Sequence, residues 1–203
     1  ADKIFFMEVE APRVAKACQP GGCVIVRMDE KGERVPLTIC DYNREEGTIS
    51  IVFQAVGAST ERMCELKSGD FFADVTGPLG NPSDLVKEDI ESLRSKKILF
   101  IAGGVGTAPV YPQVKWLHEQ GVEADVIVGA KTKNLLILTK EMAEVANYLY
   151  VATDDGSYGF KGLVTQVLED LVVNQHKQYD HCIIIGPMIM MKFVSLLTKE
   201  LGL

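Results

Sequence analysis

The sequence predicts two domains: an antiparallel β-barrel, followed by an α/β domain built on a doubly wound parallel sheet. Up to about residue 80, apolar and polar side chains alternate with the period of two that is typical of half-buried strands. From Lys97 onward, fully apolar segments of strand length alternate with amphipathic segments of helix length. A stretch rich in glycine, proline and charge, residues 77–95, separates the two patterns. We therefore assign residues 1–95 to the barrel domain with its junction, and residues 96–203 to the α/β domain.

The composition is that of a well-cored globular protein. Of the 203 residues, 47% are apolar and 24% are charged, which excludes disordered, collagen-like and coiled-coil proteins. The longest apolar stretches are interrupted by glycine and are far shorter than the ~20 residues of a membrane span. The net charge of −7 comes without a basic stripe. We therefore expect neither nucleic acid nor a membrane as a partner.

The cysteine pattern predicts a cytoplasmic protein. The chain has five cysteines that form no Cys-x-x-Cys pair, and three of them lie in or beside apolar segments. Such residues are typically reduced thiols that pack as small hydrophobic side chains. The first residues also lack the basic and apolar character of a signal sequence, so we expect no targeting segment.

Five short strands and one helix are expected in the barrel domain. The strands are residues 4–8, 23–28, 35–41, 48–55 and 70–75, and the helix is 59–66. Turn residues such as Glu30-Lys31-Gly32 separate them. So many short strands favour a closed barrel, because closure removes the exposed edges of a sheet.

The α/β domain is expected to alternate four strands with four helices. The strands, 98–102, 125–128, 148–152 and 182–185, are apolar throughout, as in strands buried on both faces. The helices are residues 108–120, 139–146, 162–174 and 188–201. This order predicts a parallel sheet with right-handed crossovers.

A glycine-rich turn directly after the first strand of this sheet is the strongest functional signal. Glycines let backbone amides approach a pyrophosphate, and the start of the following helix adds partial positive charge. Proline suits the first helical turn because it has no amide to leave unpaired. The candidate cofactor-binding residues here are Gly103, Gly104, Gly106, Thr107 and Pro109. The alternative is a tight strand-to-helix turn that binds no ligand.

Three further polar or glycine-bearing loops follow later strands of the same sheet. Ligands of open α/β sheets bind outside the carboxyl ends of the strands, so the four loops support one another. Their candidate cofactor-binding residues are Lys131, Asp155, Gly156, Gly186, Pro187 and Met188. Lys131 is either a cation near the adenosine ribose or a solvated loop residue.

No catalytic side chain and no metal ligand is assigned. We interpret Asp154 and Asp155 as loop and turn residues near the nicotinamide, because sequence alone gives no reason for a raised pKa. The three histidines have no metal-ligand spacing.

The order of barrel and nucleotide sheet, together with three motifs, resembles the ferredoxin–NADP reductase superfamily over essentially the whole chain. Arg34-Val35-Pro36-Leu37-Thr38 is similar to the superfamily's flavin motif, and Gln54-Ala55-Val56-Gly57-Ala58-Ser59-Thr60 to its FAD-pyrophosphate motif. Gly77-Pro78-Leu79-Gly80 matches a turn after the barrel. That turn occurs in the branch that contains the electron-transfer subunit of dihydroorotate dehydrogenase and the small subunit of NADH-dependent ferredoxin–NADP oxidoreductase.

The resemblance implies a flavoprotein electron-transfer module that contains FAD in the barrel and NAD, or NADP, on the sheet. Hydride would pass directly between nicotinamide and flavin, and the flavin would release electrons to an iron–sulfur partner, a larger redox subunit or ferredoxin. The implied FAD-binding residues are Arg34, Pro36, Leu37, Thr38, Gln54, Gly57, Ser59 and Thr60. The alternatives are an electron-transfer subunit of dihydroorotate dehydrogenase and a non-catalytic module that senses NAD(H).

The chain departs from the superfamily pattern at several positions. Val35 stands where relatives have the flavin-motif arginine, and Leu37 where many have a stacking aromatic residue. Relatives often have a cysteine where this chain has Ile185, so Cys182 is not assigned a catalytic role. Relatives of the branch also continue into a cysteine-rich segment that binds a two-iron, two-sulfur cluster. That segment is absent up to Leu203, so we expect the chain to be a fragment and the cluster to belong only to the full-length parent.

Overall fold

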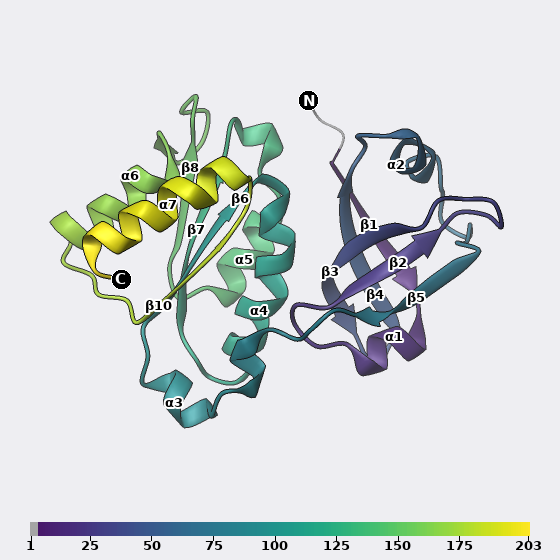
Figure 1. Cartoon of the computed structure of the whole chain (residues 1–203), viewed down its shortest axis with the longest axis horizontal. Coiled ribbons are helices and arrows are strands. Elements are labelled where there is room, and N and C mark those ends of the chain that lie inside the picture. The colour runs from purple at the N-terminus through teal and green to yellow at the C-terminus, as the bar shows by residue number, and fades with distance from the viewer. Residues whose placement is uncertain (1–3) are drawn as a thin grey trace. The chain divides into compact units, whose positions relative to one another are not determined.

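The computed structural model describes residues 4–203 and divides the chain into two compact units, Ala1–Val86 and Lys87–Leu203 (Figure 1). The division falls inside residues 77–95, the stretch expected to join the two domains. The short 3-10 turn η1 (Asp84–Lys87) spans the division. No helix within residues 4–203 is long and apolar enough to cross a membrane.

The first unit is an antiparallel, barrel-like sheet of five strands in the order β1-β4-β3-β2-β5. Alternate residues of β2, among them Val24 and Val26, are buried and pack with Ile51 of β4 in one core. The elements are β1 (Ile4–Glu10), α1 (Pro12–Ala17), β2 (Cys23–Arg27), β3 (Val35–Asn43), β4 (Thr48–Gln54), α2 (Ala58–Met63) and β5 (Asp74–Leu79). The predicted antiparallel domain is therefore confirmed.

Two details of this unit differ from the sequence-based expectation. The hydrogen-bonded order leaves β1 and β5 at its two ends, so pairing among the described strands does not close the barrel. The last strand was expected at 70–75 but begins at Asp74 and continues through Pro78. Proline is tolerated there because β5 is an edge strand, where one side of the backbone needs no partner.

The short helix α1 was not expected from the sequence. Its six residues are too few to show a full amphipathic period, although Pro12 at its start is a recognised helix signal. Val14 and Ala15 are buried in the core of the unit, together with Cys18 just after the helix. Burial of this face stabilises a helix that would not form in isolation.

The second unit is a parallel five-stranded sheet in the order β10-β6-β7-β8-β9, as the sequence predicts for a doubly wound fold. Its strands are β6 (Ile98–Gly103), β7 (Ala124–Ala130), β8 (Leu149–Thr153), β9 (Phe160–Lys161) and β10 (His181–Ile185). The helices are α3 (Ile90–Arg94), α4 (Thr107–Glu119), α5 (Thr139–Val145), α6 (Val164–Glu169) and α7 (Met188–Leu201). Helices α4 and α5 lie on one face of the sheet, and α6 and α7 on the other (Figure 1).

Two elements of this unit differ from the sequence-based expectation. Strand β9 has only two residues, too few for a recognisable pattern. The helix expected at 162–174 ends as an α-helix at Glu169 and continues as a π-helical turn, η4 (Asp170–Asn174). The Asp170 carboxylate accepts hydrogen bonds from the side chains of Asn174 and Gln175, which stabilises the wider turn.

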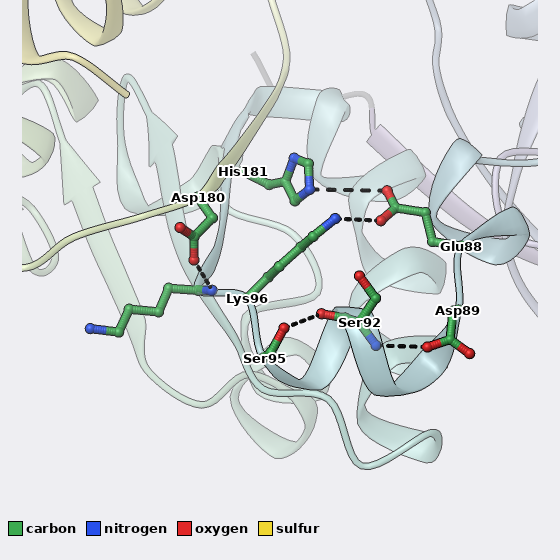
Figure 2. Close-up of polar contacts among 8 residues, drawn as sticks. Glu88, Asp89, Ser92, Ser95, Lys96, Asp180 and His181 are labelled. Carbon is green, nitrogen blue, oxygen red and sulfur yellow. Dashed lines mark hydrogen bonds and ion pairs between the residues drawn. The ribbon is translucent and has the colours of Figure 1, made fainter.

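Polar contacts hold the segment before β6 against the start of β10 (Figure 2). Lys96 Nζ lies 2.6 Å from Glu88 Oε2, and His181 Nε2 lies 4.0 Å from the other oxygen of Glu88. The backbone amide of Lys97 donates to the Asp180 carboxylate at 2.7 Å. Strand β6, the first strand of this unit along the chain, and strand β10, the last, are thus held together at their amino ends.

A buried polar group, the Asp125 cluster, stabilises the amino ends of β7 and β8. Asp125 is 6% exposed, and its carboxylate accepts hydrogen bonds from Asn147 Nδ2 at 3.0 Å, Lys177 Nζ at 2.9 Å and the Tyr179 hydroxyl at 2.8 Å. Lys177 also donates to the Tyr150 hydroxyl at 2.8 Å. Burial lowers the pKa of Lys177, but the hydrogen bonds to Tyr150 and Asp125 outweigh it and raise that pKa above its ordinary value.

Replacing Asp125→Ala should lower the free energy of unfolding by about 3 kcal/mol, because it leaves a partly buried ammonium and the buried Tyr179 hydroxyl without their acceptor. Urea denaturation of wild type and variant measures the change. Glu144→Ala, at an exposed position of α5, is the control and should stay within about 0.5 kcal/mol of wild type. A similar loss in both variants would contradict the role of the cluster.

The same cluster predicts a loss of stability at alkaline pH. Burial and the hydrogen bond to Asp125 raise the pKa of Tyr179 far above its ordinary value of 10.0. Above that pH the unfolded tyrosine releases its proton while the folded one keeps it, so stability falls by up to about 1.4 kcal/mol per pH unit. Denaturation midpoints measured between about pH 10 and 11 should fall less steeply in Tyr179→Phe than in wild type. Parallel curves would refute this assignment.

Candidate functional site

The glycine-rich turn between β6 and α4 packs directly against the junction between β10 and α7. A Cβ atom at Gly106 would lie 2.5 Å from the carbonyl oxygen of Ile185 and 2.8 Å from the Cα of Gly186. A Cβ at Gly103 would overlap the sulfur of Met190. Glycine is required at Gly106 because the two strand-to-helix turns touch there through their backbones, whereas the space at Gly103 is taken by side-chain atoms of Met190 and Pro187.

Gly104 in the same turn faces open space. Its φ of +55° is in the left-handed region, and a Cβ built on it meets nothing within 4 Å. The adjacent Thr107 begins the thirteen-residue helix α4 and is fully buried, yet its hydroxyl has no hydrogen-bond partner. An open glycine turn, an unpartnered hydroxyl and a helix start form a cradle whose chemistry suits a diphosphate. Pro109 lies in the first turn of the same helix.

The turn before α7 completes this side of the cradle. A Cβ at Gly186 would lie 3.1 Å from the Gly103 amide nitrogen, and a Cβ at Gly103 would lie 3.1 Å from Pro187 Cδ. Met188 is 82% exposed at the start of α7. The structure therefore brings the predicted residues of the first and last loops together.

The loops after β7 and β8 form a second neighbouring pair at the same sheet edge. The Asp155 amide donates to the Lys131 carbonyl at 3.3 Å, and both side chains are exposed, as is Gly156. Hydrogen bonds from the Ser157 side chain and amide lower the pKa of Asp155. Asp155 is therefore ionised at neutral pH, which fits a turn residue and argues against a general acid.

Three residues that shape these loops were not among the candidate binding residues drawn from the sequence. Met190 packs beneath Gly103 and Gly186, Thr153 is fully buried at the end of β8, and Ser157 bridges two loops. The Asp-Gly-Ser sequence at 155–157 is a recognisable side-chain turn signal that could have identified Ser157. Contacts of Met190 and Thr153 depend on tertiary packing and had no such signal.

In the first unit, the structure brings the two predicted flavin motifs next to each other. Ser59 Oγ donates to Glu33 Oε2 at 2.6 Å, which joins the start of α2 to the segment that leads into β3. Arg34 follows Glu33, and its exposed guanidinium lies 3.3 Å from the Asp74 carboxylate. The remaining motif residues of β3, Pro36, Leu37 and Thr38, pair with β2 residues 23–25.

The second motif forms an open turn at the start of α2. Gly57 precedes the helix, and a Cβ built on it meets nothing within 4 Å. Thr60 Oγ1 accepts hydrogen bonds from the amides of Val56 and Gly57 at 3.1 Å, and Gln54 is exposed at the end of β4. An open backbone turn fits the phosphates of FAD, although the Ser59 hydroxyl already donates to a carboxylate and the Arg34 guanidinium is paired with Asp74.

The remaining reactive groups do not form a competing site. Within residues 4–203, no group of three or more His, Cys, Asp or Glu side chains is arranged to hold a metal ion. None of the five cysteines, all within the described residues, forms a disulfide bond. Burial raises the pKa of Cys182 to about 11, so this thiol is protonated and unreactive at neutral pH.

Comparison with known proteins agrees with this fold. The family model described as oxidoreductase NAD-binding domain matches residues 100–196. The chain is 42% identical over 202 residues to a dihydroorotate dehydrogenase B (NAD(+)) electron transfer subunit homolog of Thermotoga maritima, and 58% identical to an uncharacterized protein of Clostridium beijerinckii. Each alignment covers 100% of this chain and 68% of the relative.

Solved structures extend the similarity to both units. A chain of NADH-dependent reduced ferredoxin–NADP oxidoreductase superposes with a TM-score of 0.87 at 40% identity, covering 100% of this chain and 70% of that one. Phthalate dioxygenase reductase shares the fold, at 17% identity and a TM-score of 0.72. The superposition covers 97% of this chain and 60% of the reductase chain.

The fold and the comparisons together define an oxidoreductase of the ferredoxin–NADP reductase type. Within that class, the chain belongs to the family of dihydroorotate dehydrogenase B electron transfer subunits and their homologues. The resemblance drawn from the sequence motifs is confirmed.

The contact between the two strand-to-helix turns predicts a difference between neighbouring glycines. Gly106→Ala should lower the free energy of unfolding by about 3 kcal/mol, because the new methyl group meets backbone atoms that cannot move aside. Gly104→Ala is the matched variant; it has space and should cost only about 1 kcal/mol of left-handed strain. Urea denaturation compares the two. A larger loss for Gly104→Ala would contradict the packing described.

Proposed function

We propose that this chain is a flavoprotein electron-transfer subunit that passes electrons between NADH, FAD and an iron–sulfur or ferredoxin-type partner. The single observation that carries the proposal is the turn at the start of α4, where Gly104 is open and left-handed and Thr107, three residues later, has a buried hydroxyl without a hydrogen-bond partner. A dinucleotide diphosphate supplies the acceptors that this cradle lacks. Family membership supports the same assignment.

In this proposal, each half of the chain holds one cofactor. Residues 1–95 bind FAD through the open turn at Gly57, the hydroxyls of its motif and the Arg34 cation. Residues 96–203 bind the dinucleotide along the carboxyl edge of the sheet. FAD, when bound, supplies the chemistry that accepts hydride and releases electrons singly.

The protein's own contribution is orientation. Backbone amides of the glycine turn fix the diphosphate, and the residues from Gly186 to Met188 shape the nicotinamide end of the site. No side chain donates or removes a proton in this scheme, which agrees with the lowered pKa of Asp155 and the protonated Cys182. We favour NADH over NADPH because the relatives' names specify NAD(+) or NADH.

The partner is proposed to be a larger redox subunit. The similar structure is a chain of NADH-dependent reduced ferredoxin–NADP oxidoreductase, and the second candidate, a dihydroorotate dehydrogenase, rests on the names of several relatives. Affinity purification from the native host identifies the larger subunit and separates the two. Cysteines that form no disulfide bond fit a cytoplasmic location.

Protein purified with added FAD should be yellow, and anaerobic NADH should bleach the flavin absorption. Absorbance spectra before and after one equivalent of NADH measure both steps. Gly104→Ala should retain the flavin yet require more NADH for the same bleaching, because its methyl group occupies the open face of the cradle. A folded protein that binds the dinucleotide without FAD would instead identify a sensor module and overturn the proposal.

A further inference from the structure

The loops that follow β7 and β8 run side by side beyond the ends of their strands. The Asp154 amide donates to the Ala130 carbonyl at 3.1 Å, and the Asp155 amide donates to the Lys131 carbonyl at 3.3 Å. The backbone pairing of the two parallel strands therefore continues into the loops at the carboxyl edge of the sheet.

The loop after β8 has a fixed shape of its own. The buried Thr153 hydroxyl donates to the Tyr158 carbonyl at 2.7 Å and accepts from the Tyr158 amide at 3.0 Å, which closes residues 154–157 into a compact loop. Gly156 has a φ of +75°, and a Cβ at Gly159 would overlap the backbone of Val151. This loop is a rigid platform for the side chains it carries.

Ser157 joins this platform to the loop after β7. Its hydroxyl donates to Asp155 Oδ1 at 2.6 Å and accepts from the Lys133 amide at 2.8 Å. Its own amide donates to the same Asp155 oxygen at 2.9 Å. The Lys133 ammonium also lies 5.5 Å from the centre of the Tyr158 ring. One hydroxyl thus links a carboxylate of one loop to the backbone of the other.

We propose that Ser157 is a positioning residue for the dinucleotide site: its hydroxyl holds residues 131–133 in register with the β8 loop, so that both loops meet the ligand in one fixed arrangement. This role rests on the function proposed above. Without the hydroxyl, the Lys133 amide loses its acceptor and Asp155 loses one of its two donors. The free loop must then be ordered by the ligand, which weakens binding.

The proposal concerns binding and not the stability of the fold. Ser157, Asp155 and Lys133 are exposed, so removing the hydroxyl leaves no buried polar group unpaired. The Asp125 cluster differs in this respect because it lies buried at the opposite end of the strands. Nor does Ser157 take part in hydride transfer, which needs no side chain in the proposed scheme.

The test is steady-state oxidation of NADH by the FAD-loaded protein with ferricyanide as electron acceptor. Ser157→Ala should raise KM for NADH about fivefold, the equivalent of one hydrogen bond, and leave kcat within about twofold of wild type. Ser157→Thr retains the hydroxyl and should restore KM to within about twofold. Ser195→Ala, at an exposed serine of α7, is the matched control and should match wild type.

The outcomes separate the two proposals. A wild-type protein that binds no FAD or does not oxidise NADH would overturn the proposed function itself. With an active wild type, the role of Ser157 is refuted by an unchanged KM in Ser157→Ala, by a fall in kcat alone, or by a raised KM that Ser157→Thr does not restore. A melting temperature of Ser157→Ala close to that of wild type would support a role in ligand binding. A large decrease in the melting temperature would show that Ser157 stabilises the fold and would overturn the proposal.

Discussion

Two strand-to-helix turns of the second unit meet with no room for a side chain between them, and the proposed dinucleotide site depends on this contact. Gly106 touches the backbone at Ile185 and Gly186, while Gly103 and Gly186 both lie over Met190. Because these positions face inward, the only glycine of the turn that is left to face outward is Gly104. Close packing on one side thus creates an open backbone surface on the other, and a ligand with negative charge can approach the start of α4 there.

Most of the fold could be predicted from the sequence because it follows from hydrophobic periodicity. The fully apolar strands of the second unit and the helix 188–201 stand out by pattern alone, and the observed α7 has those bounds. Helix α1 and strand β9 could not be found this way, because six and two residues are shorter than the period that would reveal them. Their conformations come from burial against the core and from pairing with β8.

The residues of the candidate site also fall into those that a local sequence pattern reveals and those that it does not. Glycines 103, 104 and 106 were predictable because a glycine-rich turn directly after a strand and before a helix is a local sequence signal, although the contact that requires Gly106 is made with distant residues. Ser157 and Met190 were not, because their roles are set by contacts with residues far away in the chain, such as Lys133 and Gly103. The Asp-Gly-Ser sequence at 155–157 indicated a turn. It did not indicate that Ser157 contacts the loop after β7.

The Asp125 cluster lies at the amino end of β7, and Lys131 follows its carboxyl end, about 20 Å away for a strand of this length. The buried anchor and the loop that we propose to contact the dinucleotide therefore lie at opposite ends of one strand. Substitutions in that loop can change its binding properties without removing the interactions that hold the amino end of the sheet together.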